Sequence, residues 1–332
     1  NETIWENICI NQWPSTKTPE INSLIGCSLG GFRNFYTQCF PLIIINNDKQ
    51  LSLSNGYSST FKDAEEDWLD DDDEEDVLEE LSGTSPNDFI SIVDVVFRGK
   101  SVGSKILYGI PGSGDYYGWF SNCPFRIDLL GFDGEADDGG DMLIKEGLPV
   151  VKSIEKERKD GRFWKAIWDE IRVSWILINK RTGQMANLAS WRPVSGQRHW
   201  PSDKHFLVQF GSILPAHQLV TRRVVRCNVV MKCKLVSNSD GESDSLSITE
   251  MSLQLEDLEG AHLNGRHSLL VLKDALSCQK SVNHEEVLNS YSEYIRAQSE
   301  FKEEKLRNEG RVDTIFIVCG IISFVSVCFF FF

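Results

Sequence analysis

The chain has 332 residues, a hydrophobic content of 41% and a formal net charge of −15 at pH 7, so it is long enough for one large folded domain or two ordinary ones. The negative charge is concentrated in residues 63–80, which hold 13 acids and no base, and the rest of the chain carries 36 acids against 34 bases. A body so close to neutral excludes nucleic-acid binding through a strongly basic surface.

Three short amphipathic helices are predicted within the first 45 residues. The first opens with Thr3 and Glu6 at the spacing of a capping box, and Pro14 should end it. A second is expected to begin at Thr18, and a third covers residues 32–40. Helices this short are marginal alone, so they need a common core. Their large apolar surface suggests that an upstream part is missing, and the alternative is a complete helical cap on the next domain.

Residues 46–87 are rich in Asn, Ser, Asp and Glu, and this composition predicts an acidic disordered linker. Residues 88–276 contain short apolar runs broken by Gly, Pro and Asp, which predict nine or ten strands. The expected strands include FISIVDVVF, YGWFSN, IRVSWILIN, VVRCNVVMKCKLV and HSLLVLKDAL, with a helical period only around WKAIWDEI. The predicted fold is mainly β with α, an antiparallel β-sandwich-like domain between short N-terminal helices and a C-terminal helix.

The C-terminal region divides into a polar helix at residues 277–311 and a transmembrane anchor at residues 312–332. From Ile315 to Phe332 there are eighteen uncharged, mostly apolar residues, which span roughly 27 Å as a helix and match a thin, ER-like hydrocarbon core. The sequence therefore predicts a tail anchor that leaves the main domain in the cytosol. The alternative is a buried core helix in a protein of the cytoplasm or nucleus.

The sequence shows none of the usual catalytic motifs. The segment GIPGSGDYYG fits neither a dinucleotide-binding loop nor a nucleophile elbow, and the six histidines lack metal-ligand spacing. The nine cysteines show no C-x-x-C spacing, which is typical of free thiols in a reducing compartment. We therefore expect no enzyme activity, cofactor or metal, although a hydrolase assembled from distant positions stays a generic alternative.

The segment SWRPVSGQRHWPSD is the strongest candidate for a binding surface. Aromatic residues and Arg are enriched at binding hot spots, and Trp can also stack on sugar rings. The alternative is structural, an Arg stacked over a Trp on an exposed sheet face. The candidate target or ligand surface consists of Trp191, Arg192, Arg198, His199 and Trp200.

The opening segment IWENICINQWPS resembles the end of an F-box, in which a helix of the form Leu/Ile-Trp-x-x-Leu/Ile-Cys is followed by Trp-Pro. The segments LIGCSLGGFRNFYTQCFPLI, FISIVDVVFRGKSVGSKI, FRIDLL, RVSWILINKRTGQMANLASWRPVSGQRHW and MSLQLEDLEGAHLNGRHSLLVL, in this order, are similar to plant F-box proteins with one β-rich C-terminal domain. Only the tail of the F-box motif is matched. The residues that match it are Ile4, Trp5, Ile8, Cys9 and Trp13.

The resemblance implies a substrate-recognition subunit of an SCF-type cullin–RING ubiquitin ligase. In that family the F-box binds a Skp-type adaptor, which links it to the cullin, and the C-terminal domain presents a protein target. Because the F-box start is not in this sequence, adaptor binding is expected to need a complete F-box. The alternative function is a membrane-tethered, lectin-like β-sandwich that binds a ligand and has no ubiquitin role.

Overall fold

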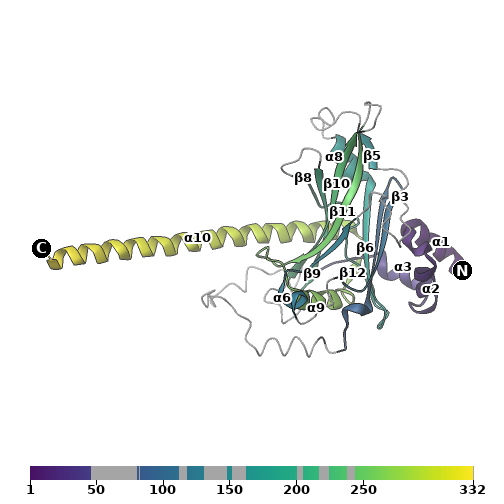
Figure 1. The fold of residues 1–332 in the computed structure, drawn as a ribbon, viewed down its shortest axis with the longest axis horizontal. Coiled ribbons are helices and arrows are strands. Elements are labelled where there is room, and N and C mark those ends of the chain that lie inside the picture. The colour runs from purple at the N-terminus through teal and green to yellow at the C-terminus, as the bar shows by residue number, and fades with distance from the viewer. Residues whose placement is uncertain are drawn as a thin grey trace.

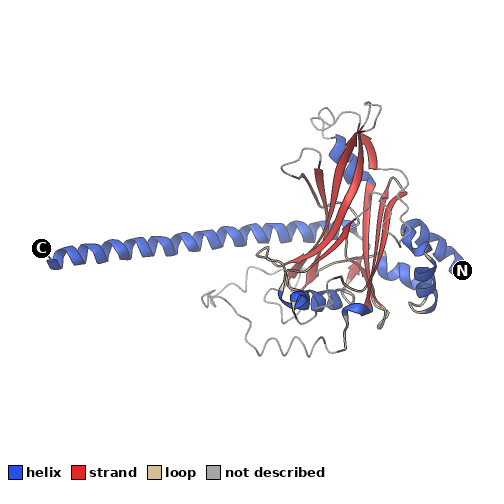
Figure 2. Ribbon diagram, viewed as in Figure 1, coloured by secondary structure: helices blue, strands red, loops and turns tan. Residues whose placement is uncertain are grey.

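The structure is a computed structural model that describes residues 1–45, 81, 83–111, 118–130, 148–151, 162–199, 205–216, 224–237 and 244–331. Two six-stranded sheets form the centre of the molecule. Three helices lie at one side, and one long helix projects from the other (Figure 1, Figure 2). Most of the predicted acidic linker at residues 46–87, including the run of 13 acids, lies outside the described residues.

The first sheet has the strand order β12–β1–β7–β6–β2–β3. Its neighbours are antiparallel except for β1 and β7, which run parallel. Its central pair, β2 and β6, aligns Phe89 with Asn179 and continues in register to Phe97 and Ile171. The strands are β1 (Leu42–Ile43), β2 (Phe89–Phe97), β3 (Lys100–Tyr108), β6 (Ile171–Asn179), β7 (Met185–Asn187) and β12 (Lys280–Ser281).

The second sheet has the order β4–β11–β10–β9–β8, and β5 also pairs with β11. It is antiparallel throughout. The long strands β9, β10 and β11 form its centre. The strands are β4 (Arg126–Leu130), β5 (Leu148–Val151), β8 (Ser195–Arg198), β9 (His205–Pro215), β10 (Val224–Ser237) and β11 (Asp244–Glu256).

One hydrophobic core lies between the two sheets. Phe89, Val93 and Trp175 of the first sheet and Phe210 and Met231 of the second belong to the same buried cluster. Side chains alternate across a strand, so the neighbours of these residues point to the outer faces. The predicted sheets are therefore present, antiparallel except for the pair of β1 and β7, and they pack as the layers of a β-sandwich do.

The N-terminal helices cover the outer face of the first sheet (Figure 1). Phe35 and Ile25 of the helices share a second buried cluster with Ile92 and Ile176 of the sheet. Strand β2 is apolar along both faces because both faces are covered. The helical elements are α1 (Glu2–Gln12), η1 (Pro14–Lys17), α2 (Pro19–Cys27) and α3 (Gly31–Cys39).

Two segments predicted as strands are helices. HSLLVLKDAL lies in α9 (Gly265–Ala275), and YGWFSN contains α6 (Trp119–Asn122). Leu269, Leu270, Val271 and Leu272 are all buried, so the middle of α9 is apolar on every side and this run shows no helical period. The cap that the prediction overlooked is Asn264, whose side chain accepts a hydrogen bond from the amide of His267 at 2.9 Å.

The predicted capping box at Thr3 and Glu6 is also wrong. Asn1 is the N-cap, and its side-chain oxygen accepts from the amide of Thr3 at 3.3 Å. Glu6 instead accepts from the side-chain amide of Asn22 at 2.9 Å, which ties α1 to α2. Two further short elements are η2 (Pro86–Asp88) and α8 (Arg162–Glu170), the latter at the predicted WKAIWDEI helix.

The C-terminal helix α10 (His284–Phe331) is continuous, where the sequence indicated a polar helix followed by a separate apolar segment. Its first turns pack on the second sheet through Tyr291 and Tyr294, together with Ile213 and Val224 of the strands. The remainder projects away from the body (Figure 1). Its C-terminal part is long and apolar enough to cross a membrane, and apolar side chains there are exposed, with Phe316 at 72%.

The packing of α6 on α9 depends on Gly265. A Cβ added at this position would lie 2.1 Å from the carbonyl oxygen of Phe120. We therefore expect Gly265→Ala to lower the free energy of unfolding by about 1–3 kcal/mol, the usual cost of overpacking. The matched control is Gly310→Ala in the exposed part of α10, where nothing lies within 4 Å. Urea unfolding followed by tryptophan fluorescence checks both, and equal midpoints for the two variants would contradict the expectation.

Candidate functional site

The segment between α1 and α2 is bound to a row of three polar side chains on the first sheet. Ser104, Asp94 and Ser174 lie opposite one another on β3, β2 and β6. The Trp13 indole donates to the Ser174 hydroxyl at 3.0 Å. Asp94 accepts from the Ser15 amide at 3.0 Å, from the Ser15 hydroxyl, and from the Ser104 hydroxyl at 2.6 Å. These bonds fix where the N-terminal helices sit on the sheet.

Asp94 is a buried carboxylate that has no cationic partner among the hydrogen bonds and ion pairs of the described residues. Only 1% of its surface is exposed. Burial raises its pKa to about 6, and the hydrogen bonds from Ser104 and Ser15 act in the opposite direction because they stabilise the ionised form. A buried carboxylate is tolerated only when its oxygens are hydrogen-bonded, so the Ser15 contacts are a condition for the docked arrangement.

The five residues that match the F-box tail fall into two groups. Cys9 and Trp13 are completely buried against the sheet and the other helices. Ile4 and Ile8 point outward, with exposures of 58% and 36%, and Trp5 is half-buried against α3. Adaptor contact by these residues stays a prediction, and the structure leaves Ile4, Ile8 and part of Trp5 accessible for it.

The predicted tryptophan and arginine surface is divided by β8. Trp191 has a positive φ of 66° and its carbonyl accepts a hydrogen bond from β6 at 3.1 Å, with Arg192 exposed beside it. Arg198 and His199 lie at the other end of β8, where the amide of His199 donates to β9 at 3.0 Å. Trp200 lies outside the described residues. The described members therefore form two pairs, and their role in binding stays a prediction.

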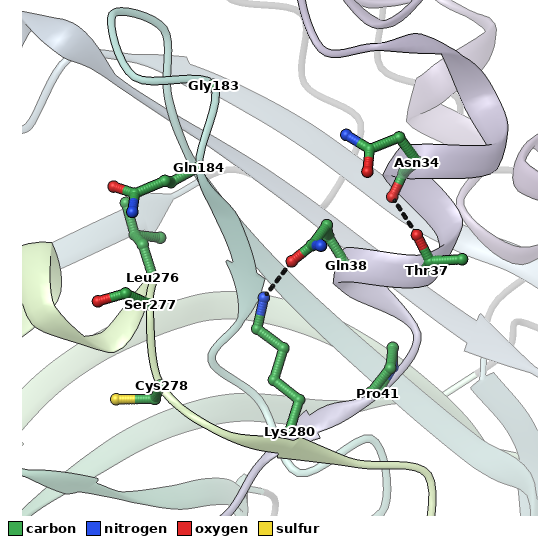
Figure 3. Close-up of a pocket in the computed structure, with 10 residues that line it drawn as sticks. All are labelled: Asn34, Thr37, Gln38, Pro41, Gly183, Gln184, Leu276, Ser277, Cys278 and Lys280. Carbon is green, nitrogen blue, oxygen red and sulfur yellow. Dashed lines mark hydrogen bonds between the residues drawn. The ribbon is translucent and has the colours of Figure 1, made fainter.

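A pocket of about 500 Å³ lies between α3, the turn from β6 to β7 and the segment that leads from α9 to β12 (Figure 3). The Lys280 ammonium donates to the Gln38 side chain at 2.9 Å and to the Met185 carbonyl at 2.7 Å. The pocket is lined by Asn34, Thr37, Gln38, Pro41, Gly183, Gln184, Leu276, Ser277, Cys278 and Lys280.

The ionisable groups of this pocket are poorly suited to covalent chemistry. Burial, with a smaller contribution from Asp274, raises the pKa of the Cys278 thiol to about 11, so little thiolate forms at neutral pH. The thiol donates to the Asp274 carbonyl at 3.3 Å and points away from Lys280 (Figure 3). Burial lowers the pKa of Lys280, but its ammonium is already bound to two acceptors. The Lys280 ammonium therefore connects α3 to the first sheet through these two bonds.

Sequence reasoning missed four residues of these sites. Asp94, Lys280, Arg172 and His284 belong to no motif, and the last two lie close enough to Arg192 for their charges to interact. Only Asp94 left a signal, because a single acid inside the apolar run FISIVDVVF needs a buried partner. Lys280 is placed by its bonds to Gln38 and Met185, and Arg172 and His284 interact with Arg192 from distant segments.

The Asp94 carboxyl makes stability depend on pH. Its pKa of about 6 in the folded protein exceeds the ordinary value of 3.8, so the folded state binds the proton more tightly than the unfolded state. The stability that this proton contributes is present below pH 3.8 and is lost as the pH rises through 6, by about 3 kcal/mol in total. Relative to Asp94→Asn, the free energy of unfolding should therefore fall between pH 4 and pH 7.5. Urea unfolding measures this, with Asp128→Asn on the exposed edge strand β4 as control. A parallel pH profile for the protein and Asp94→Asn would contradict it.

Comparison with known proteins gives relatives along nearly the whole chain. It is 26% identical to F-box protein At2g27310 from Arabidopsis thaliana, over 98% of this chain and 83% of that protein. From the same plant, Probable F-box protein At2g36090 is 26% identical over 99% and 81%, and F-box protein At3g44326 is 24% identical over 100% and 80%. No protein-family profile and no solved structure matches the chain. Over almost its full length, the chain is therefore similar to three plant F-box proteins.

Proposed function

We propose that the protein is the substrate-recognition subunit of an SCF-type cullin–RING ubiquitin ligase and acts as a non-enzymatic adaptor. The observation that carries the proposal is the similarity to three F-box proteins, which extends from the N-terminal helices through both sheets to the C-terminal helix. The F-box-like helix α1 would contact a Skp-type adaptor, which links the complex to a cullin. The sheets would present a protein target.

The packing of α1 supports this division of roles. Cys9 and Trp13 face the sheet, and Ile4 and Ile8 face solvent, so one helix can contact the body and a partner at the same time. Because Trp13 and Ser15 are hydrogen-bonded to strands, an adaptor bound on α1 would hold a fixed orientation relative to the sheets. A fixed orientation is what a ligase needs to place a bound target near the transferred ubiquitin.

We also propose that residues 315–331 anchor the protein in a membrane with the sheets in the cytosol. A helix whose apolar side chains are exposed on all sides lacks the partner that would stabilise it in water, and a lipid bilayer supplies one. Phe324 and Phe330, for example, are 71% and 92% exposed. The length of the apolar part is compatible with a thin, ER-like bilayer.

The adaptor contact is tested by co-precipitation of the full-length protein with a Skp-type adaptor. Ile8→Asp places a charge on the outward face of α1 and leaves the buried residues unchanged. Recovery of the adaptor should therefore fall at least tenfold. Leu306→Asp, at an exposed aliphatic position on α10 with 67% exposure, should leave recovery unchanged. If the full-length protein recovers no adaptor above background, the SCF role is wrong.

The membrane anchor is tested by cell fractionation of an N-terminal fluorescent fusion. The intact protein should stay in the pellet after carbonate extraction, and removal of residues 315–332 should release it to the supernatant. An intact fusion that is already soluble would show that the membrane anchor is wrong.

A further inference from the structure

Arg172 and Arg192 lie on neighbouring segments because Val173 and Trp191 form an antiparallel bridge, and both charges act on His284 at the first turn of α10. Arg172 comes from the start of β6, Arg192 from the connection after β7, and His284 is the first residue of α10. Burial lowers the pKa of His284, and the charges of Arg192 and Arg172 lower it further. Burial also lowers the pKa of Arg172, with Arg192 as the next cause. Each pair therefore lies within electrostatic range, and such a group of like charges is unfavourable unless an anion joins it.

The two arginines are held in place by their surroundings. The Arg172 guanidinium donates to the carbonyls of Ile171 at 2.6 Å and Asp169 at 2.7 Å, at the C-terminal end of α8. On the other side, the Ser190 hydroxyl accepts from the Gly211 amide at 3.1 Å and donates to the Arg192 carbonyl at 2.5 Å. These contacts fix the guanidinium of Arg172 and the backbone of Arg192.

The backbone beside Arg192 is strained. Trp191 adopts a φ of 66°, a region that a bulky residue rarely occupies and that costs of order 1–3 kcal/mol. Its carbonyl is bound by the amide of Val173 at 3.1 Å, so the surrounding sheet enforces the conformation. Strain of this kind is concentrated at binding sites, and Arg192 follows the strained residue directly in the chain.

Two of the three groups keep unused hydrogen-bonding capacity. The Nδ1 atom of His284 is buried and has no hydrogen-bond partner among the described residues. The guanidinium of Arg192 is exposed and makes no ion pair within the part of the chain that the structure describes. The carboxylates that act on Arg172 are Asp169 and Glu170, and Glu170 is itself paired with Arg98.

We propose that Arg172, Arg192 and His284 form a binding site for the phosphoryl group of a phosphorylated ligand. Two guanidinium charges match a group that carries about −1.5 to −2 charge at pH 7, whereas a single carboxylate would leave one positive charge over. The exposed fork of Arg192 suits bidentate contact with phosphate oxygens. The inference rests on the proposed function in one respect, namely that the phosphoryl group belongs to the target protein.

The position of the site disfavours a lipid headgroup as the source. His284 and Ile315 are 31 residues apart in one helix, a distance of about 46 Å at 1.5 Å per residue. The helix projects from the body without turning back (Figure 1). If the apolar part of α10 is in a membrane, the site lies far outside the headgroup layer of that membrane.

The site is tested with the full chain in detergent, by isothermal titration with inorganic phosphate and with acetate at constant ionic strength. Phosphate should bind at least tenfold more tightly than acetate. Arg192→Gln should weaken phosphate binding at least tenfold, because it removes an exposed charge that the fold does not use. Arg296→Gln, the control at an exposed position of α10, should change it less than twofold. Equal binding of phosphate and acetate, or unchanged binding by Arg192→Gln, would overturn the proposal.

A second titration distinguishes the sources of the phosphoryl group. Phosphoserine peptides of random flanking sequence should bind more tightly than inorganic phosphate and lose this advantage in Arg192→Gln, as a target-binding site requires. Peptides that bind no better than phosphate would overturn the assignment to a target protein. Neither result depends on the Skp-type adaptor, so failure of this site and failure of the SCF role are separate outcomes.

Discussion

The burial of one carboxylate, Asp94, constrains the arrangement of the whole N-terminal half. An ionised group that is removed from water must be hydrogen-bonded, and two of the donors, the amide and hydroxyl of Ser15, come from the segment between α1 and α2. Undocking the helices would leave the carboxylate without these donors and would expose the apolar outer face of β2 and β6. The helices and the first sheet are therefore energetically coupled.

This coupling explains why the first sheet reads as apolar on both faces. Ile92 and Ile176 pack against the helices, whereas Val93 and Trp175 pack against the second sheet. The polar row that contains Asp94 interrupts the apolar outer face at one place only along β2, and so defines where the Trp13–Ser15 segment can bind. Apolar contact supplies most of the stabilisation, and the polar row supplies the register, as buried polar groups do in some other folds.

Sequence reasoning recovered the hairpin of β2 and β3 and the strands β9 to β11 from their short apolar or alternating runs. It recovered the three N-terminal helices from the single apolar stripe that each one carries. The prediction of a strand at α9 was wrong because Leu269 to Leu272 are buried on every side. At such a run only the length and the capping residue distinguish a helix from a strand. Sequence reasoning also joined Arg192 to Arg198 by proximity in the chain, whereas the structure places Arg192 beside Arg172 and His284. Contacts between distant segments leave no local pattern.

The long helix α10 carries a packed end and an exposed apolar end. Its start is bound to the second sheet because Gly211 lets the Tyr291 ring approach β9, where an added Cβ would lie 3.1 Å from the ring. The buried pair of Arg226 and Glu256 and the cation–π contact of Arg226 with Tyr294 hold the next turn. The basic group at His284 and the exposed apolar residues therefore lie at opposite ends of one rigid element. A partner held at the first turn of α10 would lie on the body that carries α1, remote from any membrane that the far end enters.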